Sequence, residues 1–434
     1  MDSSRTAIVV GAGIVGICTG IELRRCRWAV RIVDKLEPGQ ACSFGNAGIL
    51  AAQAVVPIAL PGLMGRVPRM LLDPQGPLVV RWRSLPHLWR WLMHFRAAAN
   101  ESQARRSAVA LKALNGSTVE LHQALARQAG VGELVKATPG LYVHRDAAGI
   151  DVVNGLAWVL RREHGAHIEV LQGAALHDAE PNSSREYTRG VRMGPMGHTV
   201  NPLRLTQAYA ALFVKLGGVL VRAEVRSLQP DGTRVTLLTN SATLQAGAVV
   251  VAAGAWSRSL VEPLGLGLPL IAERGYHLSY ADPGVQLNHV VSEVGASFAA
   301  TSMETGLRIA GTEELGLADD PPSWRRTDML HRHARRLFPA ARLEQGSRWM
   351  GPRPGLPDSL PAIGPVPGQP RIFIAAGHGH LGLTGAPRTG QIVAAMVNGE
   401  RAGLDVRRTH RESFLAEHGA ARPQSLAATL LILQ

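Results

Sequence analysis

The hydrophobic pattern at the start of the chain predicts a strand, a helix and a second strand in succession. A short apolar run precedes Gly11, a helical pattern of apolar positions follows it, and a second apolar run ends at Asp34. Two later apolar runs, at 248–252 and 371–376, are bounded by small residues and predict buried strands. These runs favour an α/β fold.

The rest of the chain carries helical and alternating patterns. Residues 268–312 alternate between apolar and polar positions in several short runs, which predicts an antiparallel sheet. Residues 53–80 are rich in proline and glycine and are expected to be irregular. Helical patterns occur at 82–96, 102–128, 151–164, 201–215, 324–338 and 390–398, and further strands are expected at 140–144, 219–225 and 234–239.

The segment 82–96 combines tryptophans with arginines. Leu88, Trp91, Leu92 and Phe95 fall at helical spacing and predict the buried face of a helix. The same composition also suits a helix that lies on a membrane surface or against a partner protein, because tryptophan and arginine are both favoured there. The pattern alone leaves both interpretations open.

Length and charge narrow the classes of function. A chain of 434 residues with 46% hydrophobic residues is too long for one compact core and predicts about two domains. The net charge of +13 is carried mostly by arginines, which are scattered and not clustered with aromatic residues. This distribution argues against nucleic-acid binding. It favours a simpler explanation, an arginine-rich proteome, with attraction to anionic substrates or lipid headgroups as an additional effect.

Cysteines and apolar runs bear on the compartment. The three cysteines form no CxxC pair, which favours a reducing environment. No signal-peptide pattern precedes the first predicted strand, and no apolar run reaches the length that crosses a bilayer. We therefore expect a cytoplasmic protein, with peripheral contact with the cytoplasmic face of the inner membrane as the alternative. No residue pattern indicates a metal site.

The turn after the first strand has the spacing of a dinucleotide-binding turn. In such a turn Gly11 permits a tight bend, Gly13 lets the backbone approach a pyrophosphate, and Gly16 lets the helix pack closely on the strand. The pyrophosphate lies on free N–H groups at the helix N-terminus. Asp34, at the end of the second strand, is placed to accept hydrogen bonds from ribose hydroxyls.

Four separated segments are suited to a single extended cofactor. They are the opening turn, the small-residue loop 43–49, the strand end at 249–257, and the Gly-His-Gly-His loop at 377–384. Ligands collect beyond the carboxyl ends of strands in open α/β sheets, so both later strand ends fit a cofactor edge. The strand end at 249–257 lies more than two hundred residues after the opening turn. A nicotinamide enzyme would place its second nucleotide contact sooner in the chain, so this distance favours a flavin.

The chain resembles the D-amino-acid oxidase superfamily of FAD enzymes, and within it the bacterial D-amino-acid dehydrogenases. The resemblance covers about residues 5–400. The motifs that carry it are the glycine turn with Asp34, Asn46-Ala47-Gly48, Gly197-His198-Thr199-Val200-Asn201-Pro202, Ala252-Ala253-Gly254-Ala255-Trp256-Ser257, Arg274-Gly275-Tyr276-His277, Gly351-Pro352-Arg353-Pro354-Gly355-Leu356-Pro357-Asp358 and Gly377-His378-Gly379-His380-Leu381-Gly382.

The resemblance implies a discontinuous, Rossmann-like FAD-binding domain and an α+β substrate domain built on a mixed or antiparallel sheet. We expect residues 1–52, 201–267 and 346–434 in the first and residues 53–200 and 268–345 in the second. The residues expected to bind FAD are Gly11, Ala12, Gly13, Ile14, Val15, Gly16, Asp34, Lys35, Ser43, Asn46, Ala47, Gly48, Ile49, Val225, Ala253, Gly254, Trp256, Gly377, Gly379, His380, Leu381, Gly382, Leu383 and Thr384.

Candidates for substrate contact lie in the later motifs. Arg353 stands between two prolines, and its guanidinium can bind a carboxylate with two parallel hydrogen bonds. The family resemblance gives it this role, and a structural pairing with Asp358 or another acid is the alternative. Tyr276 either reaches the substrate or places its hydroxyl in solvent. His277 alternates with Tyr276, so only one of them faces the pocket, and we rank His277 lower.

Histidines of the flavin loop are the remaining candidates. His380, with His378 two residues before it, lies where an imidazole reaches the flavin or the substrate amine, or is simply a hydrogen-bonded loop residue.

The resemblance implies FAD-dependent oxidative deamination of D-amino acids, including cyclic, proline-like ones. A hydride passes from Cα to flavin N5, the imino acid hydrolyses to a 2-oxo acid, and a quinone or another carrier takes the electrons. A glycine or sarcosine oxidase that uses oxygen and a flavin-bearing subunit of a larger dehydrogenase are the alternatives. The chain departs from the family pattern in its last residues, 424–434, and in a short segment at 178–188.

Overall fold

A six-stranded sheet carries the N-terminal βαβ unit. The computed structural model describes residues 5–73, 76, 78–145 and 150–400. All neighbouring strands of this sheet are parallel except the last pair. The strand order is β10 (Val219–Arg222), β2 (Ala29–Asp34), β1 (Thr6–Val10), β14 (Ala248–Val251), β21 (Gln369–Ala376) and β20 (Ala362–Val366).

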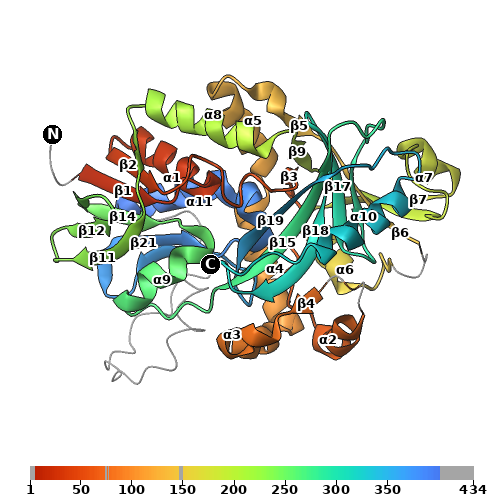
Figure 1. The fold of residues 1–434 in the computed structure, drawn as a ribbon, viewed down its shortest axis with the longest axis horizontal. Helices are drawn as coiled ribbons and strands as arrows, with labels where there is room; N and C mark the ends of the chain where they lie inside the picture. The colour runs from red at the N-terminus through yellow and green to blue at the C-terminus, as the bar shows by residue number, and fades with distance from the viewer. Residues whose placement is uncertain (1–4, 74–75, 77, 146–149, 401–434) are drawn as a thin grey trace, which may run out of the picture.

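Each face of this sheet has its own hydrophobic core, as strand alternation requires. Ala7 and Val9 of β1 pack under helices on one face, whereas Ile8 and Val10 pack against a small sheet on the other. The first layer contains α1 (Ile14–Arg25), α5 (Thr118–Gln128), α8 (Pro202–Lys215) and α11 (Gly382–Val397). The second contains β11 (Val225–Pro230), β12 (Val235–Thr239), β13 (Thr243–Ala246) and α9 (Ser257–Val261) (Figure 1).

A larger, mostly antiparallel sheet stands beside the first one (Figure 1). One of its faces packs on α10 (Arg325–Leu337). The strand order is β19 (Ser347–Gly355), β15 (Ile271–Tyr280), β18 (Gly306–Gly316), β17 (Phe298–Met303), β16 (Val290–Glu293), β6 (Gly140–His144), β8 (Arg189–Gly194) and β7 (His167–Gln172), and β4 (Leu78–Val80) pairs with β18. The antiparallel sheet predicted at 268–312 is therefore present.

A three-stranded sheet and several helices complete the described chain. The sheet is ordered β3 (Ile49–Leu50), β9 (Gly197–Thr199) and β5 (Val135–Ala137). The helices are α2 (Leu63–Leu72), α3 (Leu85–Ala98), α4 (Glu101–Asn115), α6 (Leu156–Glu163) and α7 (Ala174–Ala179). No helix of the described residues is both long enough and apolar enough to cross a bilayer.

The strands and helices do not follow the expected domain ranges throughout. β19 lies within the range assigned to FAD binding, yet it pairs with β15 of the larger sheet. α5 lies within the substrate range, yet Leu125 and Ala126 belong to the core under α1, α8 and α11. Elements from both ranges therefore interleave where the two sheets meet.

Three predicted segments differ in detail from the structure. Residues 53–80 contain helix α2 and strand β4 and are not wholly irregular. The helix expected over 102–128 is two helices, since α4 ends at Asn115 and α5 begins at Thr118. The last helix begins at Gly382 and not near 390. Residues 424–434 lie outside the described part of the chain.

Helix α3 confirms the predicted buried stripe. Leu88, Trp91 and Phe95 are buried and pack with Leu315 and Ile271 of the larger sheet. The rings of Trp91 and Phe95 stack with their centroids 4.7 Å apart.

Candidate active site

A cavity of about 880 Å³ extends from the turn after β1 to the larger sheet. Its lining comes from all four segments that the sequence singled out, together with residues of β18 and β19. The volume lies towards the upper end of the range of small-molecule and cofactor sites. One cavity therefore joins the glycine turn to Arg353.

The glycines of the turn are required for different reasons. Gly11 has a φ of +112°, and a Cβ there would lie 2.4 Å from the carbonyl oxygen of Ala252. A Cβ on Gly16 would lie 1.9 Å from the carbonyl oxygen of Gly11. A Cβ on Gly13 would meet only Ser43 Oγ, at 3.6 Å, so no packing within the protein excludes a side chain there.

The N-terminus of α1 opens on the cavity. Gly13 is its N-cap and supplies no capping side chain, and no acidic residue occupies the first turn. Gly13, Ile14 and Val15 line the cavity, where Ser43 Oγ accepts a hydrogen bond from the backbone N–H of Ile14 at 3.0 Å. A helix end of this kind attracts an anion through its N–H groups and its dipole.

Asp34 holds the turn in shape. One carboxylate oxygen accepts from the N–H of Ala12 at 2.7 Å, and the other accepts from the N–H of Leu36 at 2.9 Å. Asp34 also lines the cavity, and a carboxylate that accepts two hydrogen bonds keeps lone pairs for further donors.

Most residues expected to bind FAD line the cavity. They are Gly11, Gly13, Ile14, Val15, Asp34, Lys35, Ser43, Asn46, Ala47, Ile49, Val225, Ala253, Gly254, Trp256, Gly379, His380, Leu381, Gly382, Leu383 and Thr384. Four others do not line it: Ala12, Gly16, Gly48 and Gly377. Gly48 and Gly377 have positive φ angles, and a Cβ on either would lie within 2.4 Å of a neighbouring atom, so they shape loops behind the lining.

A second helix N-terminus, that of α11, also opens on the cavity. Helix α11 begins at Gly382 without an acidic residue in its first turn, and the residues just before it also line the cavity. His378 is buried, and its Nε2 lies 2.9 Å from Thr389 Oγ1. His380 lines the cavity. Loss of hydration among the surrounding protein groups, together with the charge of Arg353, lowers the pKa of its imidazole.

Arg353 extends across the neighbouring strand. A Cβ on Gly275 would lie 2.2 Å from Arg353 Cζ, so the guanidinium occupies the space that this glycine leaves empty. Arg353 lines the cavity and forms no ion pair with any described residue. Asp358 accepts instead from the N–H of Leu360. The structural pairing between Arg353 and Asp358 is therefore absent from the described part of the chain.

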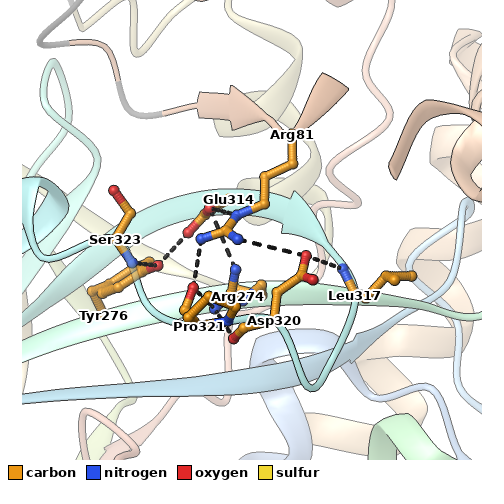
Figure 2. Close-up of polar contacts among 8 residues, drawn as sticks. All are labelled: Arg81, Arg274, Tyr276, Glu314, Leu317, Asp320, Pro321 and Ser323. Atoms are coloured by element: carbon orange, nitrogen blue, oxygen red, sulfur yellow. Dashed lines mark hydrogen bonds and ion pairs between the residues drawn. The ribbon is translucent and has the colours of Figure 1, made fainter. Parts of the chain in front are cut away.

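Tyr276 was predicted to reach the substrate, but its side chain points away from the cavity. Its side chain is buried on the face of β15 that packs on α10, and it does not line the cavity. Its hydroxyl donates to Glu314 and accepts from the N–H of Ser323 at 2.9 Å (Figure 2). Burial and the Glu314 charge raise the pKa of Tyr276 to about 12. The alternative, a hydroxyl in solvent, is also excluded.

The cluster around Tyr276 is structural. Arg274 Nη1 lies 3.4 Å from Glu314 Oε1, and Nη2 donates to the carbonyl oxygens of Asp320 and Pro321 at 2.7 and 2.9 Å. Arg81 pairs with the same glutamate and lies 3.7 Å from the carboxylate of Asp320 (Figure 2). These contacts tie β15, β18 and Arg81, which directly follows β4, to the segment before α10.

His277 faces the cavity side in place of Tyr276. Its Nδ1 donates to the carbonyl oxygen of Gly45 at 3.0 Å, and its ring stacks on Trp349 with the centroids 5.0 Å apart. Burial and the nearby charge of Arg308 lower its pKa to about 3, so the imidazole is neutral. Tyr276 and His277 lie on opposite faces of β15, as alternation predicts, and neither of them lines the cavity.

Several cavity residues carry no signal in the sequence. Trp349 lies over Gly45 and Gly351, Cys42 donates from its thiol to the carbonyl oxygen of Pro352, and Glu313 lines the cavity from β18. Glu313 lies on β18, which pairs with the strand of Gly275, and this pairing is not visible in the sequence. Among the described residues, no group of three or more His, Cys, Asp or Glu side chains could hold a metal ion.

Comparison with known proteins assigns the family. The model of the DAO family, described as FAD dependent oxidoreductase, matches residues 6–396. The chain belongs to this family. The family match and the similar fold of a solved structure confirm three predictions: the family resemblance, the α/β fold and FAD as the cofactor.

Relatives within the family carry related names. The chain is 35% identical to a D-amino-acid oxidase of Bradyrhizobium diazoefficiens, over 92% of this chain and 97% of that one. It is 31% identical to a D-amino acid dehydrogenase of Paramagnetospirillum magneticum, over 92% and 96%. The fold is similar to that of glycine oxidase from Geobacillus kaustophilus, with a TM-score of 0.71 at 23% identity over 93% and 96% of the two chains.

The residues of the cavity fit FAD. Two helix N-termini without acidic first turns open on it, Gly13 leaves the backbone bare beside α1, and Asp34 stands at the strand end. These features match a pyrophosphate flanked by a ribose. The α1 end and Asp34 would hold the nucleotide half, and the 379–384 segment would hold the ring half.

Proposed function

We propose that this oxidoreductase oxidises D-amino acids at Cα, cyclic ones such as D-proline included. The observation that carries the proposal is the position of Arg353, a guanidinium that faces the cavity and has no ion-pair partner among the described residues. A guanidinium of this kind is suited to a carboxylate, which it binds with two parallel hydrogen bonds. The names of the two relatives favour the D-configuration.

The chain's own residues orient the substrate. FAD, when bound, supplies the electron sink that no side chain provides. Arg353 fixes the carboxylate at the larger-sheet end of the cavity, and Gly275 leaves the space that lets its guanidinium reach there. The two flanking prolines restrict the backbone at Arg353. One fixed carboxylate limits how Cα is presented to the flavin.

We propose a quinone or a similar carrier as the electron acceptor, with peripheral membrane contact through α3. Trp82 just before this helix and Trp89 on it are 76% and 63% exposed, and Met93, Arg83 and Arg96 are exposed beside them. Exposed tryptophan together with arginine favours the membrane interface, where quinones reside.

Oxygen is the second candidate acceptor. The 35% identity to a protein named D-amino-acid oxidase favours it, since this value exceeds the 31% identity to the dehydrogenase of P. magneticum.

An anaerobic experiment tests the reaction itself. The purified protein is mixed with D- and L-isomers of several amino acids, with D-proline, glycine and sarcosine included, and the visible absorbance of the flavin is followed. Bleaching by D-isomers, with release of a 2-oxo acid or a cyclic imine, is expected. Bleaching by L-isomers only, or by glycine and sarcosine only, would contradict the proposal. Subsequent addition of air or a quinone analogue, with hydrogen peroxide measured, distinguishes the two acceptors.

A further inference from the structure

Two glutamates flank Arg353 at the end of the cavity, and the reaction outlined above assigns neither of them. β15 lies between β19 and β18, so Arg353 and Glu313 reach towards the same place from the two strands beside Gly275. Glu273 is two residues before Gly275 on the central strand and is the direct pairing partner of Arg353. Three strands therefore bring one guanidinium and two carboxyl groups together.

A β-bulge sets the position of Glu313. The register between β15 and β18 shifts between Arg274 and Tyr276, so Thr312 and Glu313 together oppose the single residue Gly275. Thr312 has a φ of +60°, which is uncommon for a β-branched residue. Bulges of this kind redirect side chains, and they are frequent beside active sites. Glu313 lines the cavity, and neither an ion pair nor a hydrogen bond joins its carboxylate to any described residue.

Glu273 is the buried member of the pair. It is 3% exposed, its Oε2 has no hydrogen-bond partner, and its carboxyl group lies where a Cβ on Gly355 would be. Burial and the charge of Glu313 raise the pKa of Glu273 above the ordinary value of a glutamate, which favours its protonated form. The end of the cavity therefore presents the Arg353 guanidinium and the Glu313 carboxyl group, while Glu273 is buried and does not line the cavity.

We propose that Glu313 is the amino-group site of this enzyme: its carboxylate pairs with the substrate ammonium and accepts one of its protons. The inference rests on the proposed amino-acid oxidation. A site with one guanidinium and one carboxylate is complementary to a zwitterion, since Arg353 takes the carboxylate and Glu313 takes the ammonium. A simple carboxylic acid satisfies only half of it.

The proton step balances without another reactant. One N–H bond of the ammonium breaks, one O–H bond forms on Glu313, and the amine is left neutral with a free electron pair on nitrogen. A neutral amine supports departure of the Cα hydrogen, whereas an ammonium opposes it. Burial raises the pKa of Glu313 above its ordinary value, which brings it closer to that of its proton donor.

The charged and titratable groups around Glu313 are compatible with this step. Arg353 on β19 lowers the pKa of Glu313 in part, and burial raises the pKa of Glu273 on β15. His380 is kept neutral, and burial raises the pKa of Cys42 to about 12, so its thiol is neutral too. Of the two glutamates, Glu313 is the one that lines the cavity.

A matched pair of ligands tests the inference without turnover. 2-Aminoisobutyrate has a carboxylate and an ammonium but no Cα hydrogen, so it cannot be oxidised, and isobutyrate has the same shape without the amine. Binding of each to the flavin-loaded protein is followed by the change in flavin absorbance. The wild type is expected to prefer 2-aminoisobutyrate, and Glu313→Gln is expected to weaken it by at least tenfold while binding isobutyrate as well as the wild type or better.

Flavin reduction gives the second readout. With an amino acid that reduces the wild type, Glu313→Gln is expected to reduce about 100-fold more slowly at pH 7. The deficit should shrink as pH rises, because a growing fraction of the amino acid then arrives with a neutral amine. Glu186→Gln is the matched control: Glu186 forms an exposed ion pair with Arg336 and does not line the cavity.

Several results would overturn the inference. They are a wild type that binds isobutyrate as tightly as 2-aminoisobutyrate, a Glu313→Gln protein that keeps the wild-type preference, or a deficit that does not change with pH. If Glu313→Gln does not retain flavin, Glu313→Asp retains the charge on a shorter side chain and should show a smaller loss of the same preference. Failure of every D-amino acid to reduce the wild type would overturn the proposed reaction, whereas the ligand pair would still decide the role of Glu313.

Discussion

At the scale of single residues, Gly13 and Gly16 of the turn after β1 lack a side chain for different reasons. A Cβ on Gly16 would overlap the backbone of Gly11, whereas a Cβ on Gly13 would clear every protein atom by 3.6 Å or more. Gly16 is therefore required by the fold, and Gly13 is required only by what lies in the cavity.

This contrast predicts different phenotypes for two similar variants. Gly16→Ala should destabilise the flavin-free protein by about 1–3 kcal/mol, because backbone must move to admit the methyl group. Gly13→Ala should leave the thermal stability of the flavin-free protein little changed and reduce the FAD affinity at least tenfold. Thermal unfolding and FAD titration measure both quantities. Equal FAD affinity in Gly13→Ala and the wild type would show that the cofactor does not approach this backbone.

Tyr276 offers a second residue-level prediction. Tyr276→Phe removes the hydroxyl that donates to Glu314 and accepts from Ser323, so the free energy of unfolding should fall by about 1–3 kcal/mol. The rate of anaerobic flavin reduction should stay within about twofold of the wild type, since Tyr276 does not line the cavity. A large loss in the rate of flavin reduction with an unchanged free energy of unfolding would indicate that Tyr276 contacts the substrate.

Alternation along a strand explains why this residue was predicted wrongly. The sequence shows that Tyr276 and His277 face opposite sides of β15, but not which side carries the cavity. The answer depends on α10, whose Leu330 and Ala334 pack on the same face as Tyr276. The position of Glu313 was equally hidden, because a bulge at Thr312 leaves no recognisable pattern in the sequence.

At the scale of elements, α11 shows how tertiary contacts override local signals. Gly385, Pro387 and Gly390 suggest a loop before residue 390, yet the helix begins at Gly382. Pro387 cannot donate to the carbonyl of Leu383, and His122 Nε2 from α5 donates to that carbonyl at 2.9 Å instead. A Cβ on Gly390 would lie 2.7 Å from the carbonyl oxygen of Cys18, so this glycine permits close packing on α1.

Helix α3 carries a prediction of its own. Replacement of Trp82 and Trp89 by serine should weaken binding to vesicles that contain anionic lipid, because two exposed aromatic side chains would no longer enter the interface. Flotation or sedimentation with vesicles measures the bound fraction. Val214→Ser is the matched control, since Val214 is 48% exposed on α8. Helix α8 lies at the top of the view in Figure 1, whereas α3 lies at the bottom. Identical vesicle binding by the wild type and the double variant would exclude this surface.

At the scale of the whole molecule, the sequence was most informative where one element carries a complete signal. The βαβ unit with Asp34, the helix that Asn201 caps and the buried strand β21 all appear as predicted. The interleaving of the two sheets was not accessible, because it depends on long-range pairing such as that of β19 with β15. Spacing along the chain does not encode such contacts.

The central claim is that one cavity joins the dinucleotide turn to Arg353, so that cofactor and substrate carboxylate are held by different parts of the molecule. The direct measurement is anaerobic flavin reduction by a D-amino acid in Arg353→Ala and Arg353→Lys, with the FAD content of each determined beforehand. Both variants should keep their FAD and be reduced roughly 100-fold more slowly or worse, with Lys retaining more rate than Ala. Reduction of fully flavinated Arg353→Ala at the wild-type rate would contradict the account.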